Sequence, residues 1–246
     1  MVSRETPPAL PATPESARGV FPSARLPLIE AYAASLATDG VVRGLIGPRE
    51  VPRLWERHLL NCAVLGEAID EGVSVCDIGS GAGLPGLVLA IARPDLQITL
   101  VEPLLRRTTY LSEVVEEFEL DNVEVVRGRA DALHGERWFD TVTSRAVAPL
   151  GRLLGWSMPL VRPEGALVAM KGSSVADEIT EAAGVLRTLK CAAPEMLDLG
   201  VGIVDPHTYA VRVAWADPAQ VVLGARDRSS SSKRGTGRKA KPRRRS

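Results

Sequence analysis

The residues of this chain best suited to chemistry form a glycine-rich loop. An apolar stretch at 73–78 is followed by Gly79, Gly81 and Gly83 at alternate positions, and then by a proline-initiated helical pattern at 85–92. Glycine lets a backbone bend sharply and approach a ligand closely, and a helix N-terminus offers N–H groups that lack an internal partner. This order of strand, loop and helix predicts a site for a nucleotide or an adenosine compound, with a bare turn as the structural alternative.

The residue that ends the predicted strand indicates which ligand the loop binds. Residues 81–86 fit the G-x-G-x-x-G spacing of dinucleotide sites, but that motif should begin directly after the strand, whereas here Asp77 and Gly79 come first. A carboxylate at this point suits a ligand with an ammonium group and would repel a pyrophosphate. An acidic residue before G-x-G-x-G is typical of methyltransferases that use S-adenosylmethionine. We therefore expect that cofactor to contact Asp77, Gly79, Gly81 and Gly83.

Two further carboxylates follow later predicted strands. Glu102 comes directly after the strand predicted at 97–101, where a carboxylate can accept hydrogen bonds from both hydroxyls of a ribose. Asp131 comes after the strand predicted at 123–126 and can accept from an adenine amino group, while the neighbouring backbone N–H reaches the ring. The alternatives are a surface glutamate for Glu102 and a helix N-cap for Asp131. We expect both residues to bind the cofactor.

The residues after the fourth predicted strand should indicate the methyl acceptor. Enzymes that methylate amino groups usually place Asn/Asp-Pro-Pro-aromatic here, and those that methylate carbon need a thiolate nucleophile. The chain instead has Thr143, Ser144 and Arg145. An acceptor with an accessible lone pair, such as guanine N7, needs neither device and depends chiefly on positioning. Arg145 could hold guanine O6, the cofactor carboxylate or an RNA phosphate, and the sequence leaves these three roles open.

The elements that must position these residues alternate between strand and helix. Strands are predicted at 73–78, 97–101, 123–126, 141–143, 166–170 and 209–213, and helices at 85–92, 104–118, 147–158 and 175–189. This alternation predicts an α/β fold with a mostly parallel, doubly wound sheet of the Rossmann-like kind. Ligands of such sheets bind beyond the carboxyl ends of the strands, where the glycine loop falls.

The chain divides into four predicted segments. Residues 1–24 are rich in proline and are expected to be disordered, and residues 25–70 carry two helical patterns that we interpret as an N-terminal helical cap. Residues 71–226 form the expected methyltransferase domain, and residues 227–246 a disordered basic tail. Within the cap, His58 suggests a general base, but guanine N7 has no proton to remove. We therefore favour a hydrogen-bonded histidine that ties the cap to the core.

Charge is distributed unevenly along the chain although its formal net charge is zero. From residue 229 onward there are eight basic residues and no acidic one, which leaves 22 basic against 30 acidic residues in the rest. Such a tail suggests attraction to a polyanion such as RNA, with a solubilising end as the equal alternative.

The composition also bounds the class of protein. The three cysteines are scattered and form no C-x-x-C pair, so we expect neither a disulfide framework nor a metal site, and we expect the cytoplasm. The sequence contains no apolar run approaching the roughly 20 residues that span a bilayer, so we expect no membrane contact.

Several motifs occur together in one order and spacing. They are residues 57–61 (Arg-His-Leu-Leu-Asn), the loop at 77–86 with its Leu-Pro-Gly ending, residues 129–131 (Arg-Ala-Asp) and residues 144–146 (Ser-Arg-Ala). Over about residues 25–215 the chain resembles the bacterial 16S rRNA guanine-N7 methyltransferase family, also called glucose-inhibited division protein B. It departs from the family pattern at Asn61, where aspartate is usual, and at Asp131, where glutamate is commoner. The carboxylate is kept at Asp131, so the role in binding adenine survives.

The resemblance implies a function and a set of contacts. It implies methylation, with S-adenosylmethionine as the donor, of a guanine in the 530 loop of 16S rRNA in the small ribosomal subunit. It also implies donor contacts at Gly79, Leu84, Ala130, Asp131 and Arg145. We expect a cytoplasmic monomer. The alternatives are a methyltransferase for a small molecule or a protein, and a non-catalytic RNA-binding factor of ribosome assembly with the same fold.

Overall fold

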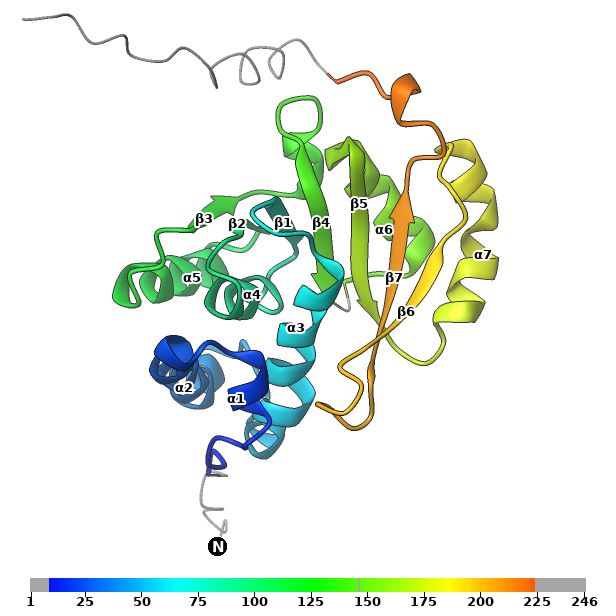
Figure 1. Ribbon diagram of the computed structural model, residues 1–246. Helices are drawn as coiled ribbons and strands as arrows, with labels where there is room; N and C mark the ends of the chain where they lie inside the picture. The colour runs from blue at the N-terminus through cyan, green and yellow to red at the C-terminus, as the bar shows by residue number, and fades with distance from the viewer. Residues whose placement is uncertain (1–8, 146, 224–246) are drawn as a thin grey trace, which may run out of the picture.

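The computed structural model describes residues 9–145 and 147–223, which form one seven-stranded sheet flanked by helices (Figure 1). The strands are β1 (Ser74–Ile78), β2 (Gln97–Glu102), β3 (Val123–Arg127), β4 (Phe139–Arg145), β5 (Val161–Lys171), β6 (Glu195–Leu199) and β7 (Thr208–Ala214). They lie in the order β3-β2-β1-β4-β5-β7-β6. The first five strands pair in parallel, and β7 runs antiparallel between β5 and β6. The prediction of a mostly parallel, doubly wound sheet is confirmed.

Helices cover both faces of the sheet. The α-helices are α1 (Ala17–Val20), α2 (Leu26–Ser35), α3 (Asn61–Ala63), α4 (Gly86–Ala92), α5 (Leu105–Glu117), α6 (Leu150–Ser157) and α7 (Val175–Thr188). Shorter 3₁₀ and π turns are η1 (Ser23–Arg25), η2 (Leu36–Gly40), η3 (Pro48–Arg53), η4 (Leu54–Leu60), η5 (Val64–Ala68), η6 (Ala130–Leu133), η7 (Met158–Leu160) and η8 (Pro218–Gln220). Among the described residues no helix is long and apolar enough to cross a membrane.

The pleat of each strand divides the core into two layers. On β5, Val168 belongs to the cluster under the cap, α4 and α5, whereas Leu167 and Ala169 belong to the cluster under α6 and α7. Successive side chains of a strand point to opposite faces, so a strand buried on both faces is apolar at nearly every position. This explains why the parallel strands were visible in the sequence as continuous apolar runs.

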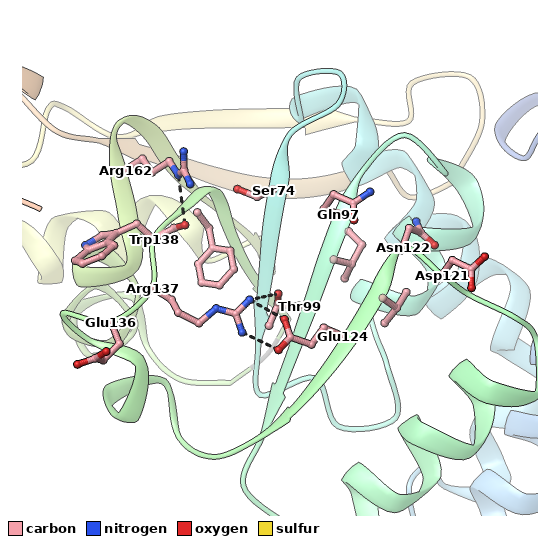
Figure 2. Close-up of a pocket in the computed structure, with 13 residues that line it drawn as sticks. Ser74, Gln97, Thr99, Asp121, Asn122, Glu124, Glu136, Arg137, Trp138 and Arg162 are labelled. Atoms are coloured by element: carbon pink, nitrogen blue, oxygen red, sulfur yellow. Dashed lines mark hydrogen bonds and ion pairs between the residues drawn. The ribbon is translucent and has the colours of Figure 1, made fainter. Parts of the chain in front are cut away.

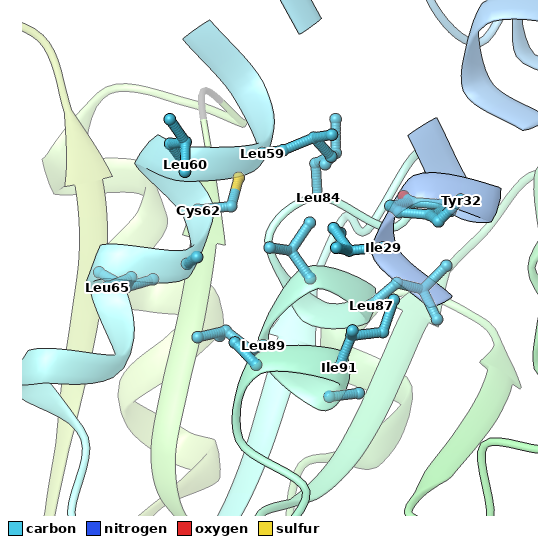
Figure 3. Packing of buried hydrophobic residues seen from close by; sticks show 14 of the residues in the cluster. Ile29, Tyr32, Leu59, Leu60, Cys62, Leu65, Leu84, Leu87, Leu89 and Ile91 are labelled. Atoms are coloured by element: carbon cyan, nitrogen blue, oxygen red, sulfur yellow. The ribbon is translucent and has the colours of Figure 1, made fainter. Parts of the chain in front are cut away.

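The cap packs directly on the glycine loop and α4. Figure 3 shows Leu84 and Leu87 among Ile29 and Tyr32 of α2 and Leu59 of η4, all of them in one buried cluster. The Tyr32 hydroxyl donates a buried hydrogen bond of 2.7 Å to the Ala82 carbonyl inside the loop. The helical cap is therefore present and shares one core with the sheet.

The N-terminal region differs from the prediction of disorder for residues 1–24. Ala17 and Phe21 are buried, and the indole N–H of Trp55 donates to the Pro11 carbonyl at 3.3 Å. Two apolar side chains four residues apart anchor a one-turn helix on the cap, and this spacing was hidden among the prolines. The prediction is wrong for residues 9–24, while residues 1–8 and 224–246, with the whole of the expected tail, lie outside the described residues.

Two other elements depart from the sequence prediction. The edge strand β6 was missed because its acidic and exposed positions do not resemble a buried strand. The helix predicted at 147–158 begins only at Leu150, since Pro149 disfavours helical geometry in the residue before it. Residues 147–149 are thereby left as an irregular, bent link at the carboxyl end of β4, beside the predicted site.

We expect Tyr32→Phe to lower the free energy of unfolding by about 1–3 kcal/mol, because the Ala82 carbonyl would lose its partner inside the core. Amide exchange at Gly83 and Leu84 should accelerate as the loop loosens. The matched control is Tyr110→Phe, whose hydroxyl pairs with Ser35 at 3.0 Å and does not touch the loop. Equal loop exchange in both variants would contradict the proposed link between cap and loop.

Candidate active site

The loop after β1 is shaped by glycine conformations that other residues rarely adopt. Gly79, Gly81 and Gly83 have φ values of +72°, +58° and +98°. A Cβ on Gly83 would also clash with the Leu87 side chain and the Tyr32 hydroxyl. The loop thus combines left-handed backbone with close packing against the cap, as predicted for a backbone that approaches a ligand.

Asp77 supports this loop from below instead of lining a pocket. It is fully buried, and its Oδ2 accepts a 3.0 Å hydrogen bond from the N–H of Gly86, the first residue of α4. Its other carboxylate oxygen, Oδ1, is buried without a partner among the described residues. The carboxylate faces the helix start and does not line any of the pockets described below, and its expected contact with a ligand ammonium group stays a prediction.

Glu102, the last residue of β2, is almost completely buried and joins three elements. Its Oε2 accepts from the Gly81 N–H at 3.0 Å, and its Oε1 accepts from the Leu104 N–H at 3.0 Å. Arg107 of α5 lies 3.4 Å from Oε2. A carboxylate offers about four acceptor positions, so at least one remains for a ribose hydroxyl. Sequence reasoning found the residue but missed that it also anchors the glycine loop.

A pocket of about 670 Å³ opens at the carboxyl ends of β1 to β4, and we call it the carboxyl-end pocket. Of the predicted site residues, five line it: Gly79, Glu102, Ala130, Asp131 and Arg145. Asp131 is an exposed residue inside the turn η6, and the N-cap position of this turn is occupied by Arg129. The N-cap alternative for Asp131 is therefore not observed. Trp156 of α6 and Leu104 add apolar walls.

A second, smaller pocket of about 360 Å³ lies between the loop and the cap, and we call it the loop–cap pocket. Gly81 and Leu84 line it together with His58, and it shares Gly79, Arg107 and Arg145 with the carboxyl-end pocket. Gly83 lines neither pocket and acts through the backbone turn.

Arg145 is positioned by a chain of hydrogen bonds from the cap. Its Nη1 donates to His58 Nδ1 at 2.7 Å, and His58 Nε2 lies 2.8 Å from Glu50 Oε2. Because a guanidinium only donates, Nδ1 must be the acceptor and Nε2 must carry the hydrogen that is donated to Glu50. Burial, followed by the charge of Arg145, lowers the pKa of His58. The prediction of a histidine that ties the cap to the core is confirmed, although Glu50 was not foreseen.

Lys171 and the three cysteines are the other side chains with reactive groups to consider. Lys171, at the end of β5, lies 2.7 Å from Glu178 Oε2 and donates to the Ala148 carbonyl at 3.0 Å, so its charge is already neutralised. Burial raises the pKa of the Cys62 and Cys191 thiols to about 11, and that of Cys76 further still. The three cysteines therefore remain protonated near neutral pH.

A pocket of about 480 Å³ on the opposite edge of the sheet does not carry these features (Figure 2). Arg137 there donates to both carboxylate oxygens of Glu124, at 3.0 and 2.7 Å, and to the Thr99 hydroxyl at 3.1 Å. Arg162 donates to the Trp138 carbonyl at 3.3 Å. The paired charges indicate a structural role at the amino ends of the strands.

Comparison with known proteins agrees with this geometry. The family model described as GidB, rRNA small subunit methyltransferase G, matches residues 25–201. The chain belongs to this family. It is 64% identical to the ribosomal RNA small subunit methyltransferase G of Nocardioides sp. over 220 residues, which cover 89% of this chain and 86% of that protein. It is 62% identical to the protein of the same name from Corynebacterium glutamicum strain ATCC 13032, with 82% and 91% covered.

Solved structures agree on the fold alone. The mitomycin 7-O-methyltransferase MmcR has a TM-score of 0.54 at 18% identity, covering 75% of this chain and 60% of that chain. M. jannaschii TYW2 in complex with AdoMet has a TM-score of 0.50 at 15% identity, covering 63% and 73%. This chain thus has a Rossmann-like class I methyltransferase fold, in which the glycine loop and Glu102 lie at the carboxyl edge of the sheet.

The buried carboxyl of Asp77 should make stability depend on pH. Burial raises its pKa from an ordinary 3.8 to about 7, so the folded state loses stability as pH rises through that range. Asp77→Asn cannot ionise and should become increasingly more stable relative to the natural protein between pH 5 and 7, by up to about 1.4 kcal/mol per pH unit. Urea unfolding of both proteins at pH 5, 6, 7 and 8 measures this difference. Two parallel pH curves would refute the assignment.

Proposed function

We propose that this protein transfers the methyl group of S-adenosylmethionine to N7 of a guanine in the 530 loop of 16S rRNA. The observation that carries the proposal is the position of Arg145. It ends β4 between the carboxyl-end pocket and the cap, and the histidine to which it donates, His58, has both ring nitrogens engaged. At this point Arg145 offers the acceptor a hydrogen-bond donor and His58 offers it no free nitrogen, which suits an acceptor lone pair that needs only to be positioned.

The carboxyl-end pocket fits S-adenosylmethionine. Its volume of about 670 Å³ lies in the range of small-molecule sites. Glu102 can accept from a ribose hydroxyl, and Asp131 can accept from an adenine amino group, with Trp156 as an apolar wall. When bound, S-adenosylmethionine supplies an electrophilic methyl group on a sulfonium. The residues around it hold the donor, and Arg145 is the group nearest to the acceptor side.

The surroundings of Arg145 support a ring nitrogen over carbon as acceptor. Methylation of a pyrimidine carbon requires a thiolate, and Cys62 and Cys76 are buried thiols whose pKa values are raised. His58 donates through Nε2 and accepts through Nδ1, so it has no free nitrogen with which to remove a proton. Guanine N7 needs neither group.

The proposed substrate follows from the family. Relatives that are 64% and 62% identical carry the name ribosomal RNA small subunit methyltransferase G, and we extend that substrate, the small-subunit rRNA, to this chain. A cytoplasmic monomer remains our expectation. The basic tail, which would add affinity for RNA phosphates, lies outside the described residues.

Transfer of tritium from labelled S-adenosylmethionine to purified 30S subunits tests the proposal. We expect one labelled nucleotide, identified after nuclease digestion as 7-methylguanosine in the 530 loop. Label in a protein or a small molecule would overturn the acceptor assignment. A protein that binds 30S subunits and transfers no label would be a non-catalytic assembly factor.

Donor binding should depend on Glu102. Glu102→Ala removes an acceptor for the ribose and leaves the Gly81 N–H without its partner, and each charge-assisted bond is worth about 1.5–3 kcal/mol. Calorimetry with S-adenosylhomocysteine should show binding at least about tenfold weaker. Glu124→Ala, which removes an exposed carboxylate from the neighbouring strand, is the matched control and should bind normally. Unchanged affinity in Glu102→Ala would exclude the ribose assignment.

Arg145 should matter for the reaction more than for folding. Arg145→Ala removes a donor that faces the proposed acceptor, and methylation of 30S subunits should fall by about 10²-fold, the usual cost of a lost positioning donor. The melting temperature should change little, because the Arg145 side chain makes just one hydrogen bond to the described residues. Full activity with a lower melting temperature would make Arg145 a structural partner of His58.

A further inference from the structure

Another pocket, of about 840 Å³, lies between the cap, the ends of β4 and β5 and the start of β7. We call it the Tyr209 pocket. Arg145 and Val147 line both this pocket and the carboxyl-end pocket, so the two cavities adjoin at the end of β4. The hairpin between β6 and β7 is fixed beside the cap, since the Gly200 N–H donates to Glu67 at 3.2 Å. The pocket is therefore a preformed feature next to the donor site.

Tyr209 gives this pocket an exposed aromatic ring. The large apolar side chains that are exposed among the described residues are eight, and Tyr209, at 39% exposure, is the single aromatic one. Tyr209 is paired with Lys171 in the β5–β7 ladder, which fixes the backbone under the ring. Proteins that bind unstacked RNA bases use exposed aromatic rings as platforms for those bases.

Buried polar atoms beside this pocket lack partners. Thr208 is only 4% exposed, and its Oγ1 has no hydrogen-bond partner among the described residues. The same holds for Oδ1 of Asn61 on α3, and both residues line the pocket. Unpaired buried polar atoms are costly and rare in folded proteins, and their presence is explained when a ligand satisfies them after a small side-chain rotation.

Charges around the pocket are divided between its two sides. Arg57 of η4 is half exposed and uses Nη1 for its ion pair with Glu50 at 3.2 Å. Arg145 likewise uses Nη1 alone, so both keep further N–H donors for a phosphate or a base edge. On the α7 side, Glu178 is neutralised by Lys171, and Glu181 is an exposed carboxylate. A phosphate is thus favoured next to the guanidinium of Arg57. It is disfavoured next to α7 because the Glu181 carboxylate would repel it, and an uncharged ring fits better there.

We propose that the Tyr209 pocket receives one unstacked purine nucleotide of RNA, with the base on the Tyr209 ring and its phosphate at Arg57. The inference deepens the proposed function, on which it rests, by assigning the acceptor nucleotide to this cavity. The hydroxyl of Thr208 and the amide of Asn61 bond the base or ribose. Arg145, shared with the carboxyl-end pocket, marks the side from which the methyl group arrives.

Single-turnover methylation of 30S subunits by variants of the full chain tests this assignment. Tyr209→Ala should lower kcat/KM about tenfold through loss of stacking, whereas Tyr209→Phe, which keeps the ring, should stay within about threefold of the natural protein. Met196→Ala, at an exposed position of β6 outside the pocket, is the control and should be unaffected. Binding of S-adenosylhomocysteine should be unchanged in all three variants. An unaffected Tyr209→Ala, or a Tyr209→Phe as poor as Tyr209→Ala, would overturn the proposal.

Thr208→Val gives an independent signature. Removing an unpaired buried hydroxyl should raise the melting temperature, and loss of its bond to RNA should lower kcat/KM several-fold. A variant that is more stable and fully active would contradict the role of Thr208.

Cosedimentation of Tyr209→Ala with 30S subunits separates this inference from the proposed function. If the natural protein binds subunits without methylating them, the proposed function fails, and the pocket is upheld only if Tyr209→Ala still weakens binding.

Discussion

The Glu102 carboxylate receives the backbone N–H groups of Gly81 and Leu104, and the rest of the site depends on this contact. The glycines allow the loop to turn, but the loop backbone must be held in one conformation to form the wall of a pocket. Glu102 fixes the loop to the end of β2, Asp77 holds the start of α4, and Tyr32 holds the Ala82 carbonyl from the cap. Three buried polar groups on three elements thus turn a flexible segment into a rigid wall.

The cap belongs to the site as much as the sheet does. Glu50 orients His58, and His58 in turn holds Arg145 at the end of β4. Arg145, which lines both the carboxyl-end pocket and the Tyr209 pocket, is thus positioned by a residue 87 positions away along the chain. The same helical segment presents Arg57 and Asn61 to the Tyr209 pocket. The sheet carries the carboxyl-end pocket, and in this protein the preceding helices hold Arg145 and contribute side chains to the Tyr209 pocket.

The parallel strands and the position of Glu102 could be predicted because they depend on the pattern of neighbouring residues in the sequence. Apolar runs buried on both faces of the sheet identified the parallel strands, and the position of Glu102 directly after one of them placed it in the carboxyl-end pocket. The order of the strands beyond β5 and the polar edge strand β6 were not visible, since pairing at an edge leaves little trace in hydrophobicity. The roles of Tyr32 and Tyr209 were missed because the residues beside them in the fold are distant in sequence. Glu50 lies only eight positions from His58, but no sequence motif marks the two as partners.

Asp77 and Lys171 show that residue type alone does not reveal the protein partner of a charged side chain. An acidic residue at the end of β1 suggested a ligand contact, yet its carboxylate points to the Gly86 N–H, one layer beneath the pocket. Lys171 ends β5 as a basic residue, and Glu178 on α7 neutralises it. In both cases the helix that follows the strand supplies the partner, and only the packing of that helix decides between ligand and protein.

The most direct measurement is a crystal structure of the protein with S-adenosylhomocysteine. The account predicts the nucleoside in the carboxyl-end pocket, with a ribose hydroxyl on Glu102, the adenine amino group near Asp131 and the sulfur directed toward Arg145. A nucleoside bound elsewhere, such as the pocket beside Arg137 on the opposite edge of the sheet, or a ribose turned away from Glu102, would contradict it.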